Sequence, residues 1–219
     1  MLERTLASLS GPSADIEPSE ELWRAIRARH PPLWPALLAD AAVTAHYRGE
    51  REEFRSRLDA LVQMIRLAWV SDAFLAQALY RAKARGQALG VPVLPRLAHR
   101  LAMTFAQVSI GDPVVIQPGI YIIHGQVVID GMVEIAEGTV IGPWVTIGLR
   151  AGDFQGPKIE ARVSIGTGAK IIGPVTVGPD ATVGANAVVI DHVPAGNTVV
   201  GAPARPVAPP GDDVRPSLR

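Results

Sequence analysis

The chain has 219 residues, no cysteine, and 21 basic against 21 acidic residues, so its formal net charge is zero. This length allows one domain or two small ones with a real core. The lack of cysteine excludes disulfides, thiolate metal sites and an acyl-cysteine intermediate. Because charges of neither sign gather into a patch, nucleic-acid and membrane partners are not expected.

The N-terminus, which opens Met-Leu-Glu-Arg, lacks the apolar stretch of a signal peptide. The longest apolar runs, such as Ile120–Ile123, are far too short to span a bilayer. The sequence therefore predicts a soluble protein of the cytoplasm.

The first half of the chain predicts a series of helices. Their ranges are Ser19–Arg29, Pro35–Tyr47, Glu50–Val70, Asp72 to about Leu89, and Pro95–Phe105. Ser19 and Ser71 suit helix N-caps, and Gly90 suits a left-handed stop. Within the third helix, apolar residues at helical spacing predict a face that packs against other helices, namely Phe54, Leu58, Leu61 and Ile65.

Beyond residue 105 a repeat of six replaces the helical pattern. A branched aliphatic residue recurs at Ile110, Ile116 and Ile122, then after a slip of one residue at Ile129, Ile135, Ile141 and Ile147, and again at Ile159, Ile165, Ile171, Val177, Val183 and Val189. Six residues make a short strand and a tight corner, and three such units close one triangular coil around the aliphatic side chains. The repeat predicts a left-handed parallel β-helix of roughly four and a half coils.

These patterns divide the chain into segments. Residues 19–105 are predicted to form an all-α domain that caps the N-terminal end of the coils. Residues 106–207 are predicted to form the β-helix domain, with Val193–Val207 lying along a flank. The terminal segments 1–18 and 208–219 are expected to be mobile.

Two histidines, His124 and His192, fall within the repeat. His124 lies at the slip of the frame, where a loop pushed out of the coil would lift its side chain and Gly125 would leave room for a ligand. Imidazole, with a reference pKa of about 6.5, suits a general base at neutral pH. The alternative is a histidine that only satisfies a corner hydrogen bond. His192 is predicted to be a solvated turn residue.

A metal site is the competing use of these histidines. They lie about four coils apart, so they cannot share one ion, and a third ligand is lacking. No metal is expected.

Gly148, Gly166 and Gly184 recur at intervals of one coil. They are predicted to stack along one edge and to leave a ladder of backbone amides uncovered. A pantetheine arm is long and thin and carries two amides, so such an edge could bind it. Corner geometry alone is the alternative explanation.

Over roughly residues 72–207 the chain resembles the serine acetyltransferase family and its hexapeptide acyltransferase relatives. The resemblance is carried by the segments Phe74–Arg81, Gly119–His124, Val145–Gly148 with Gly156–Ile159, Ile165–Gly173 and Val193–Arg205. These correspond to the family's pre-coil helix, catalytic segment, coenzyme A loop region, last coils and tail.

The resemblance implies an enzyme that transfers an acetyl group directly from acetyl-CoA to a hydroxyl acceptor. It implies that His124 is the general base, that Gly148, Thr167 and Ala185 contact the coenzyme, and that Arg205 lies near its phosphates. Backbone N–H groups near Gly148 would stabilise the oxyanion. A site between subunits of a homotrimer, or of a dimer of trimers, is expected.

Three positions depart from the family pattern. Members that act on serine carry aspartates where this chain has Ser109 and Ile123, and a second histidine where it has Gly156. These losses disfavour free serine and leave a sugar, a polysaccharide or a specialised metabolite open as the acceptor. Asp40 or Arg48 is a candidate to compensate. A non-catalytic β-helix scaffold is the further alternative.

Overall fold

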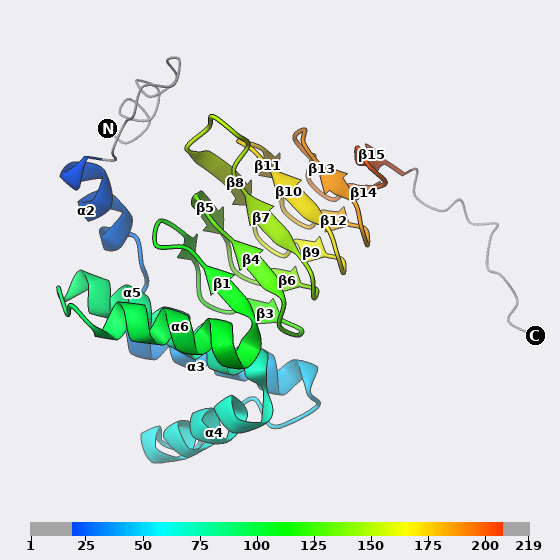
Figure 1. Ribbon diagram of the computed structural model, residues 1–219. Coiled ribbons are helices and arrows are strands. Elements are labelled where there is room, and N and C mark those ends of the chain that lie inside the picture. The colour runs from blue at the N-terminus through cyan, green and yellow to red at the C-terminus, as the bar shows by residue number, and fades with distance from the viewer. Residues whose placement is uncertain (1–18, 208–219) are drawn as a thin grey trace, which may run out of the picture.

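The computed structural model describes residues 19–207, in which five helices precede a stack of parallel β-strand coils (Figure 1). The helices are α2 (Glu20–Ala28), α3 (Leu33–Tyr47), α4 (Arg57–Val70), α5 (Asp72–Ala88) and α6 (Leu94–Ala106). The segments 1–18 and 208–219, which were expected to be mobile, lie outside the described residues.

Local hydrogen bonds set the ends of the helices. The side chains of Ser19 and Ser71 accept from the backbone N–H groups of the third residues of α2 and α5, Leu22 and Phe74, and Gly90 has a φ of 69°. These three predictions are confirmed. The start of α4 at Glu50 is wrong, because Ser56 accepts from the Asp59 N–H at 3.1 Å and thereby caps the helix six residues later.

The predicted packing face is confirmed only for Phe54, which precedes α4 and packs against the helical core, and is wrong for the other three residues. Leu58, Leu61 and Ile65 are 71%, 44% and 63% exposed. The buried residues of α4 are Ala60, Met64 and Leu67, which pack against Phe74 of α5 and Ala41 of α3. The helix therefore turns its smaller apolar face to its neighbours, and the larger one has no partner among the described residues of one chain.

The strands form three parallel sheets, one on each side of a triangular coil. Sheet A contains β1 (Val108–Ile110), β4 (Val127–Ile129), β7 (Thr146–Gly148), β10 (Lys170–Ile172) and β13 (Val188–Val189). Sheet B contains β2 (Val115–Ile116), β5 (Met132–Ile135), β8 (Gln155–Ile159) and β11 (Thr176–Val177). Sheet C contains β3 (Tyr121–Ile122), β6 (Val140–Ile141), β9 (Ser164–Ile165), β12 (Thr182–Val183), β14 (Thr198–Val200) and the antiparallel β15 (Arg205–Pro206).

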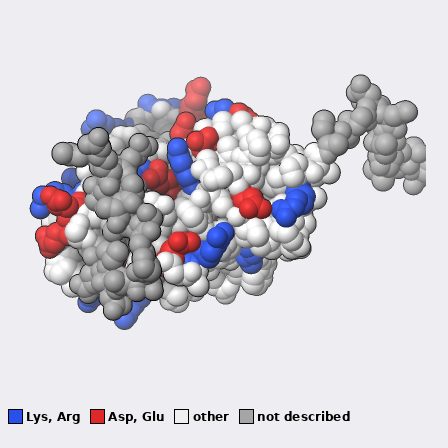
Figure 2. All heavy atoms as spheres, turned by 90° about the horizontal axis from the view of Figure 1, so that it is seen from above, with Lys and Arg blue, Asp and Glu red and all other residues white. Residues whose placement is uncertain are grey.

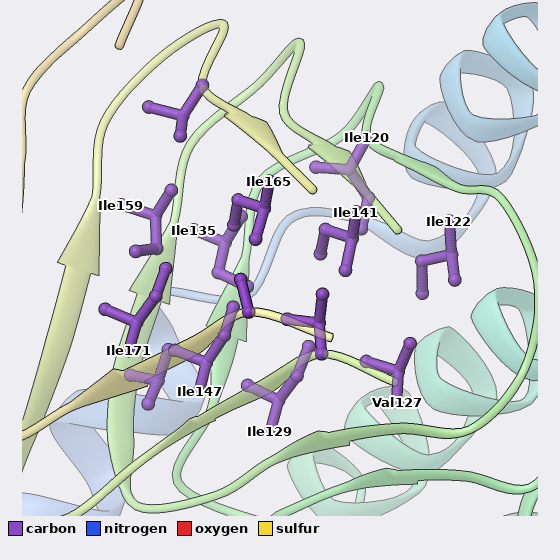
Figure 3. Packing of buried hydrophobic residues seen from close by; sticks show 14 of the residues in the cluster. Ile120, Ile122, Val127, Ile129, Ile135, Ile141, Ile147, Ile159, Ile165 and Ile171 are labelled. Carbon is purple, nitrogen blue, oxygen red and sulfur yellow. The ribbon is translucent and has the colours of Figure 1, made fainter. Parts of the chain in front are cut away.

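Branched aliphatic side chains fill the interior in rows, as the repeat predicts. Ile122, Ile141 and Ile165 pair across successive strands of sheet C, and each is at most 2% exposed. Figure 3 shows these three side chains, with Ile129, Ile147 and Ile171 of sheet A, pointing into the same narrow space. The prediction of a left-handed parallel β-helix after an all-α region is confirmed.

The helices close the N-terminal end of the stack, where the first coil has no preceding strand (Figure 1). Side chains of α5 take up carbonyl groups of that coil: Tyr80 donates to Val114 O at 2.8 Å, Arg81 to Ile116 O at 2.5 Å and to Gln117 O at 2.9 Å, and Gln77 to Ile120 O at 3.2 Å. Buried polar groups without partners are costly, so these bonds let a helix cover the open end.

A buried ion pair orients the most important of these side chains. Arg81 donates to Asp40 of α3 at 2.8 Å, and the two side chains are 3% and 0% exposed. Asp40 also accepts from the Gly119 N–H at 2.8 Å. The pair thus joins α3, α5 and the first coil.

The C-terminal part of the repeat region differs from the prediction. Val193 and Val199 are buried, with Val193 bridged to Val177 and Val199 paired with Val183. The segment expected along a flank therefore begins as one more coil, and only β15 folds back against β14.

The surface seen in Figure 2 shows acidic and basic side chains interspersed. Within the described residues, no helix combines the length and hydrophobicity that crossing a bilayer requires.

The buried pair makes a stability prediction. Replacing Asp40 with Ala leaves the Arg81 guanidinium buried without its carboxylate and should lower the free energy of unfolding by about 3–5 kcal/mol, measured by urea denaturation. Arg162→Ala, which removes an exposed pair with Asp180, should change stability little. A loss below about 1 kcal/mol for Asp40→Ala would contradict this role.

Candidate functional site

One edge of the β-helix carries an extra residue, and that residue brings His124 out of the repeat. We call this the C–A edge, where each strand of sheet C leads into the next strand of sheet A. The strand register gives its corners as residues 123–126, 142–144, 166–168 and 184–186. Only the first of these corners has four residues. The predicted slip of the frame is thus a one-residue insertion that includes His124, whose side chain is exposed.

Gly125 serves a different purpose from the one expected. A Cβ atom at this position would lie 1.9 Å from the carbonyl oxygen of Ala106, the last residue of α6. The glycine therefore makes room for the helix end rather than for a ligand. The corner that carries His124 rests on the C-terminus of α6, where the helix dipole places partial negative charge.

The glycines that stack on the C–A edge are Gly142, Gly166 and Gly184. A Cβ on Gly142 would meet Thr167 N at 2.8 Å, and one on Gly166 would meet Ala185 N at 2.6 Å. Successive corners are thus in close backbone contact, as predicted for two of these glycines.

The predicted stacking of Gly148 in this row is wrong. Gly148 pairs with Ile172 at the far end of the sheet A strands, because the six residues 149–154 form an insertion that shifts the later repeats. Strands of three residues separate the two edges, so Gly148 lies about 10 Å along the strand from the C–A edge.

Thr167 and Ala185 occupy equivalent places in adjacent corners of the C–A edge, as predicted. Within the described residues, their backbone N–H groups have no hydrogen-bond acceptor, so both amides are available to a ligand. Arg205 follows the last turn, where Gly201 O accepts from Val188 N, and its guanidinium lies 3.3 Å from Asp191. Both partners of that pair are largely exposed, which leaves the arginine free to bind another anion.

Trp144 is a feature of this edge that the sequence analysis missed. It occupies the corner after His124 and is 58% exposed, with a φ of 64°. Equivalent corner positions hold Gln126, Gly168 and Asn186, also at positive φ. A bulky residue in this backbone region is unusual and strained. An indole in a Gly-Pro-Trp corner could have been noticed, although the sequence does not reveal its φ.

The three positions that depart from the family pattern are not together in one chain. Ile123 adjoins His124, and Ser109 lies on sheet A opposite Val128. Gly156 lies on sheet B, where it lines a cavity of about 200 Å³ beneath Leu22 and Ile26 of α2 and the following Arg29. That cavity does not include His124.

Two residues proposed to compensate have different surroundings. Asp40 is fully buried and binds Arg81 and the Gly119 N–H. It therefore cannot reach an acceptor, and the prediction that it compensates is wrong. Arg48, the residue that follows α3, is exposed and donates to Glu50 at 2.9 Å. Its positive charge opposes the rise that burial causes in the pKa of Tyr121.

The second histidine of the repeat is a surface turn residue, as predicted. His192 is exposed, and its Nδ1 accepts from the Thr176 N–H at 2.8 Å. In the described part of the chain, no group of three or more histidine, aspartate or glutamate side chains could hold a metal ion.

Comparisons with known proteins agree with the hexapeptide repeat of the coils. The family model described as bacterial transferase hexapeptide (six repeats) matches residues 156–191. The serine acetyltransferase of Helicobacter pylori strain J99 is 38% identical over 118 residues, which cover 52% of this chain and 68% of that protein. That of Escherichia coli K12 is 38% identical over 125 residues, 56% of this chain and 45% of that protein.

Solved structures extend the similarity into the helices. A serine acetyltransferase in complex with CoA superimposes with a TM-score of 0.66 at 26% identity, covering 85% of this chain and 74% of that chain. The serine acetyltransferase of Vibrio cholerae superimposes with a TM-score of 0.67 at 27% identity, covering 88% and 72%.

The strain at Trp144 yields a prediction. Asparagine tolerates the left-handed region far better than tryptophan, so Trp144→Asn should raise the free energy of unfolding by about 1 kcal/mol. Trp69→Asn, on the exposed face of α4, is the control and should give no gain. A marked loss of stability in Trp144→Asn would mean that the indole packs against something that one chain does not provide.

Proposed function

The chain belongs to the serine acetyltransferase family, and we propose that it is an O-acetyltransferase in which His124 deprotonates the acceptor hydroxyl. The observation that carries the proposal is the one-residue insertion that lifts His124 out of the coil on the same edge as Thr167 and Ala185. The relatives confirm the prediction of an acyltransferase that uses acetyl-CoA as co-substrate.

Coenzyme A would extend along the C–A edge. Neighbouring strands lie about 4.8 Å apart, so three coils place Ala185 about 14 Å from the corner of His124. The free N–H groups of Thr167 and Ala185 would donate to the pantetheine carbonyls, and Arg205 beyond them would bind phosphate. This order leaves the thioester at the end of the edge where His124 lies.

His124 would act by general base catalysis. An imidazole nitrogen takes the hydroxyl proton as the acceptor oxygen attacks the thioester carbonyl. The tetrahedral intermediate then collapses, the C–S bond breaks, and the leaving sulfur recovers the proton. The C-terminus of α6 beneath this corner favours the imidazolium that forms in between. The helix would thereby supply negative potential that Ile123, in place of an aspartate, does not.

The site would be completed by a second copy of the chain. His124 is exposed on a convex edge, whereas Gly148 lies at the opposite ends of the sheet A strands. The proposed oxyanion donors near Gly148 can meet His124 only if they come from a neighbouring subunit. A homotrimer, or a pair of trimers, would provide that arrangement.

The acceptor would be a hydroxyl compound other than free serine. Binding a zwitterion needs a fixed anion for its ammonium group and a cation for its carboxylate, and Ser109, Ile123 and Gly156 supply neither. Asp40, the candidate anion, is buried. A substrate whose polar groups lack partners binds poorly, so serine should be a weak acceptor.

The role of His124 has a direct test. His124→Ala should reduce acetyl transfer about 10²–10⁴-fold, the usual cost of removing a general base, while the affinity for CoA measured by calorimetry stays the same. His192→Ala is the matched control and should retain activity. Transfer by His124→Ala within a few-fold of the unmodified protein would refute the assignment.

The coenzyme edge can be blocked separately. Thr167→Trp and Ala185→Trp would each place an indole over the free amides and should weaken CoA binding at least tenfold by calorimetry, about 1.4 kcal/mol. Glu137→Trp, at an exposed corner between sheets B and C, should bind CoA normally. Unchanged affinity in both edge variants would place the coenzyme elsewhere.

A further inference from the structure

Two tyrosines stack beside the corner that carries His124. The rings of Tyr47, in the last turn of α3, and Tyr121, in β3, have centroids 4.3 Å apart and planes within 3° of parallel. Tyr121 is half-buried, whereas Tyr47 is 52% exposed. The outer surface of this pair is therefore an aromatic platform that solvent can reach.

The platform is fixed in position by the buried contacts of α3. Asp40 binds both Arg81 and the Gly119 N–H, and a Cβ on Gly119 would come within 3.9 Å of Val43. Tyr47 lies two helical turns beyond Asp40 on the same helix. The same interactions that close the coil thus hold the ring of Tyr47 against β3.

The platform lies close to His124, because Tyr121 lies two residues before the corner that carries this histidine. Ile120 and Ile122 point into the coil, so Tyr121 and Ile123 lie on its outer side. Tyr121 and His124 are three residues apart in a chain that bends at the corner, so their Cα atoms lie at most about 11 Å from each other. An acceptor that rests on the platform must therefore extend several ångströms to bring a hydroxyl group to the imidazole.

Charged side chains border the aromatic surface. Arg48 donates to Glu50, which also binds Arg66, and His46 Nδ1 lies 2.7 Å from Glu52. Burial raises the pKa of Tyr121, and the charge of Arg48 opposes that rise. The platform therefore combines a flat apolar surface with several hydrogen-bonding groups around it.

We propose that Tyr47 and Tyr121 bind the acceptor and that the acceptor is a carbohydrate, with one pyranose ring stacked on Tyr47 and a hydroxyl group presented to His124. The proposal rests on the acetyl transfer proposed above and specifies its substrate class. A pyranose has an apolar ring face for the aromatic surface and hydroxyl groups at its rim for Arg48 and Glu50. A pyranose is also larger than serine, so its hydroxyl groups reach further from the platform toward His124.

An aryl alcohol fits these observations less well. Flat apolar ligands bind best in enclosed pockets that bury most of their surface. Tyr47 is half exposed and surrounded by ion pairs, so the platform is open and wet, which suits a ligand that keeps many hydrogen bonds to water and protein.

The experiment measures CoA thiol release from acetyl-CoA with methyl glucoside, methyl galactoside, methyl mannoside and methyl N-acetylglucosaminide, and with L-serine and glycerol as acyclic acceptors. At least one pyranoside should exceed serine and glycerol at least tenfold in kcat/KM. Tyr47→Ala should raise the KM for that pyranoside about three- to tenfold, the range expected for a lost ring contact, with kcat and the KM for acetyl-CoA nearly unchanged.

Two controls separate this effect from a structural one. Tyr47→Phe keeps the ring and should restore the KM, and Trp69→Ala removes an exposed aromatic residue of α4 and should change nothing. A kcat/KM for serine or glycerol above that of every pyranoside would overturn the inference, and so would a pyranoside KM that Tyr47→Ala leaves unchanged. So would the absence of pyranoside acetylation in a protein that binds CoA normally, whereas failure of CoA binding itself would instead refute the proposed function.

Discussion

The site depends on one constraint, the parallel hydrogen-bond register that stacks equivalent corner residues of successive coils. In a regular coil every corner repeats the last, and the C–A edge follows this rule at Thr167 and Ala185. A line of equivalent amides results, and such a line suits an elongated ligand. The rule is broken at the first corner, where one additional residue carries His124. The proposed general base and the proposed binding edge thus both come from one regular structure with a one-residue insertion in its first corner.

A second irregularity, the insertion of residues 149–154, explains why the prediction for Gly148 failed. The aliphatic repeat predicts the coil, the slip at His124 and the interior side chains. These features follow from the spacing of neighbouring residues, which can be read directly from the sequence. Strand pairing across a long insertion cannot be read in this way. The same pattern, a glycine after an aliphatic residue, occurs on more than one sheet, so it does not show to which sheet a given glycine belongs. Gly148 was therefore grouped with Gly166, although Gly142 holds that place.

Tertiary contacts decided the remaining differences. The role of Gly125 depends on the carbonyl of Ala106, which reaches it only once α6 has packed on the first coil. The packing face of α4 could not be chosen from spacing, because both of its faces are apolar. The stack of Tyr47 on Tyr121 joins residues far apart in sequence, so no local sequence pattern predicts it. The helical region thus does two things that the sequence does not show: it closes the coil through Arg81 and places an aromatic surface beside His124.

The central claim is that the acetyl donor lies along the C–A edge and ends at His124. A crystal structure of the protein with CoA tests this most directly. The account predicts pantetheine amides against the corners of Thr167 and Ala185, and the CoA sulfur close enough to His124 for a substrate hydroxyl, which needs about 3 Å from the base, to fit between them. A sulfur atom beneath α2, in the cavity beside Gly156, would contradict it.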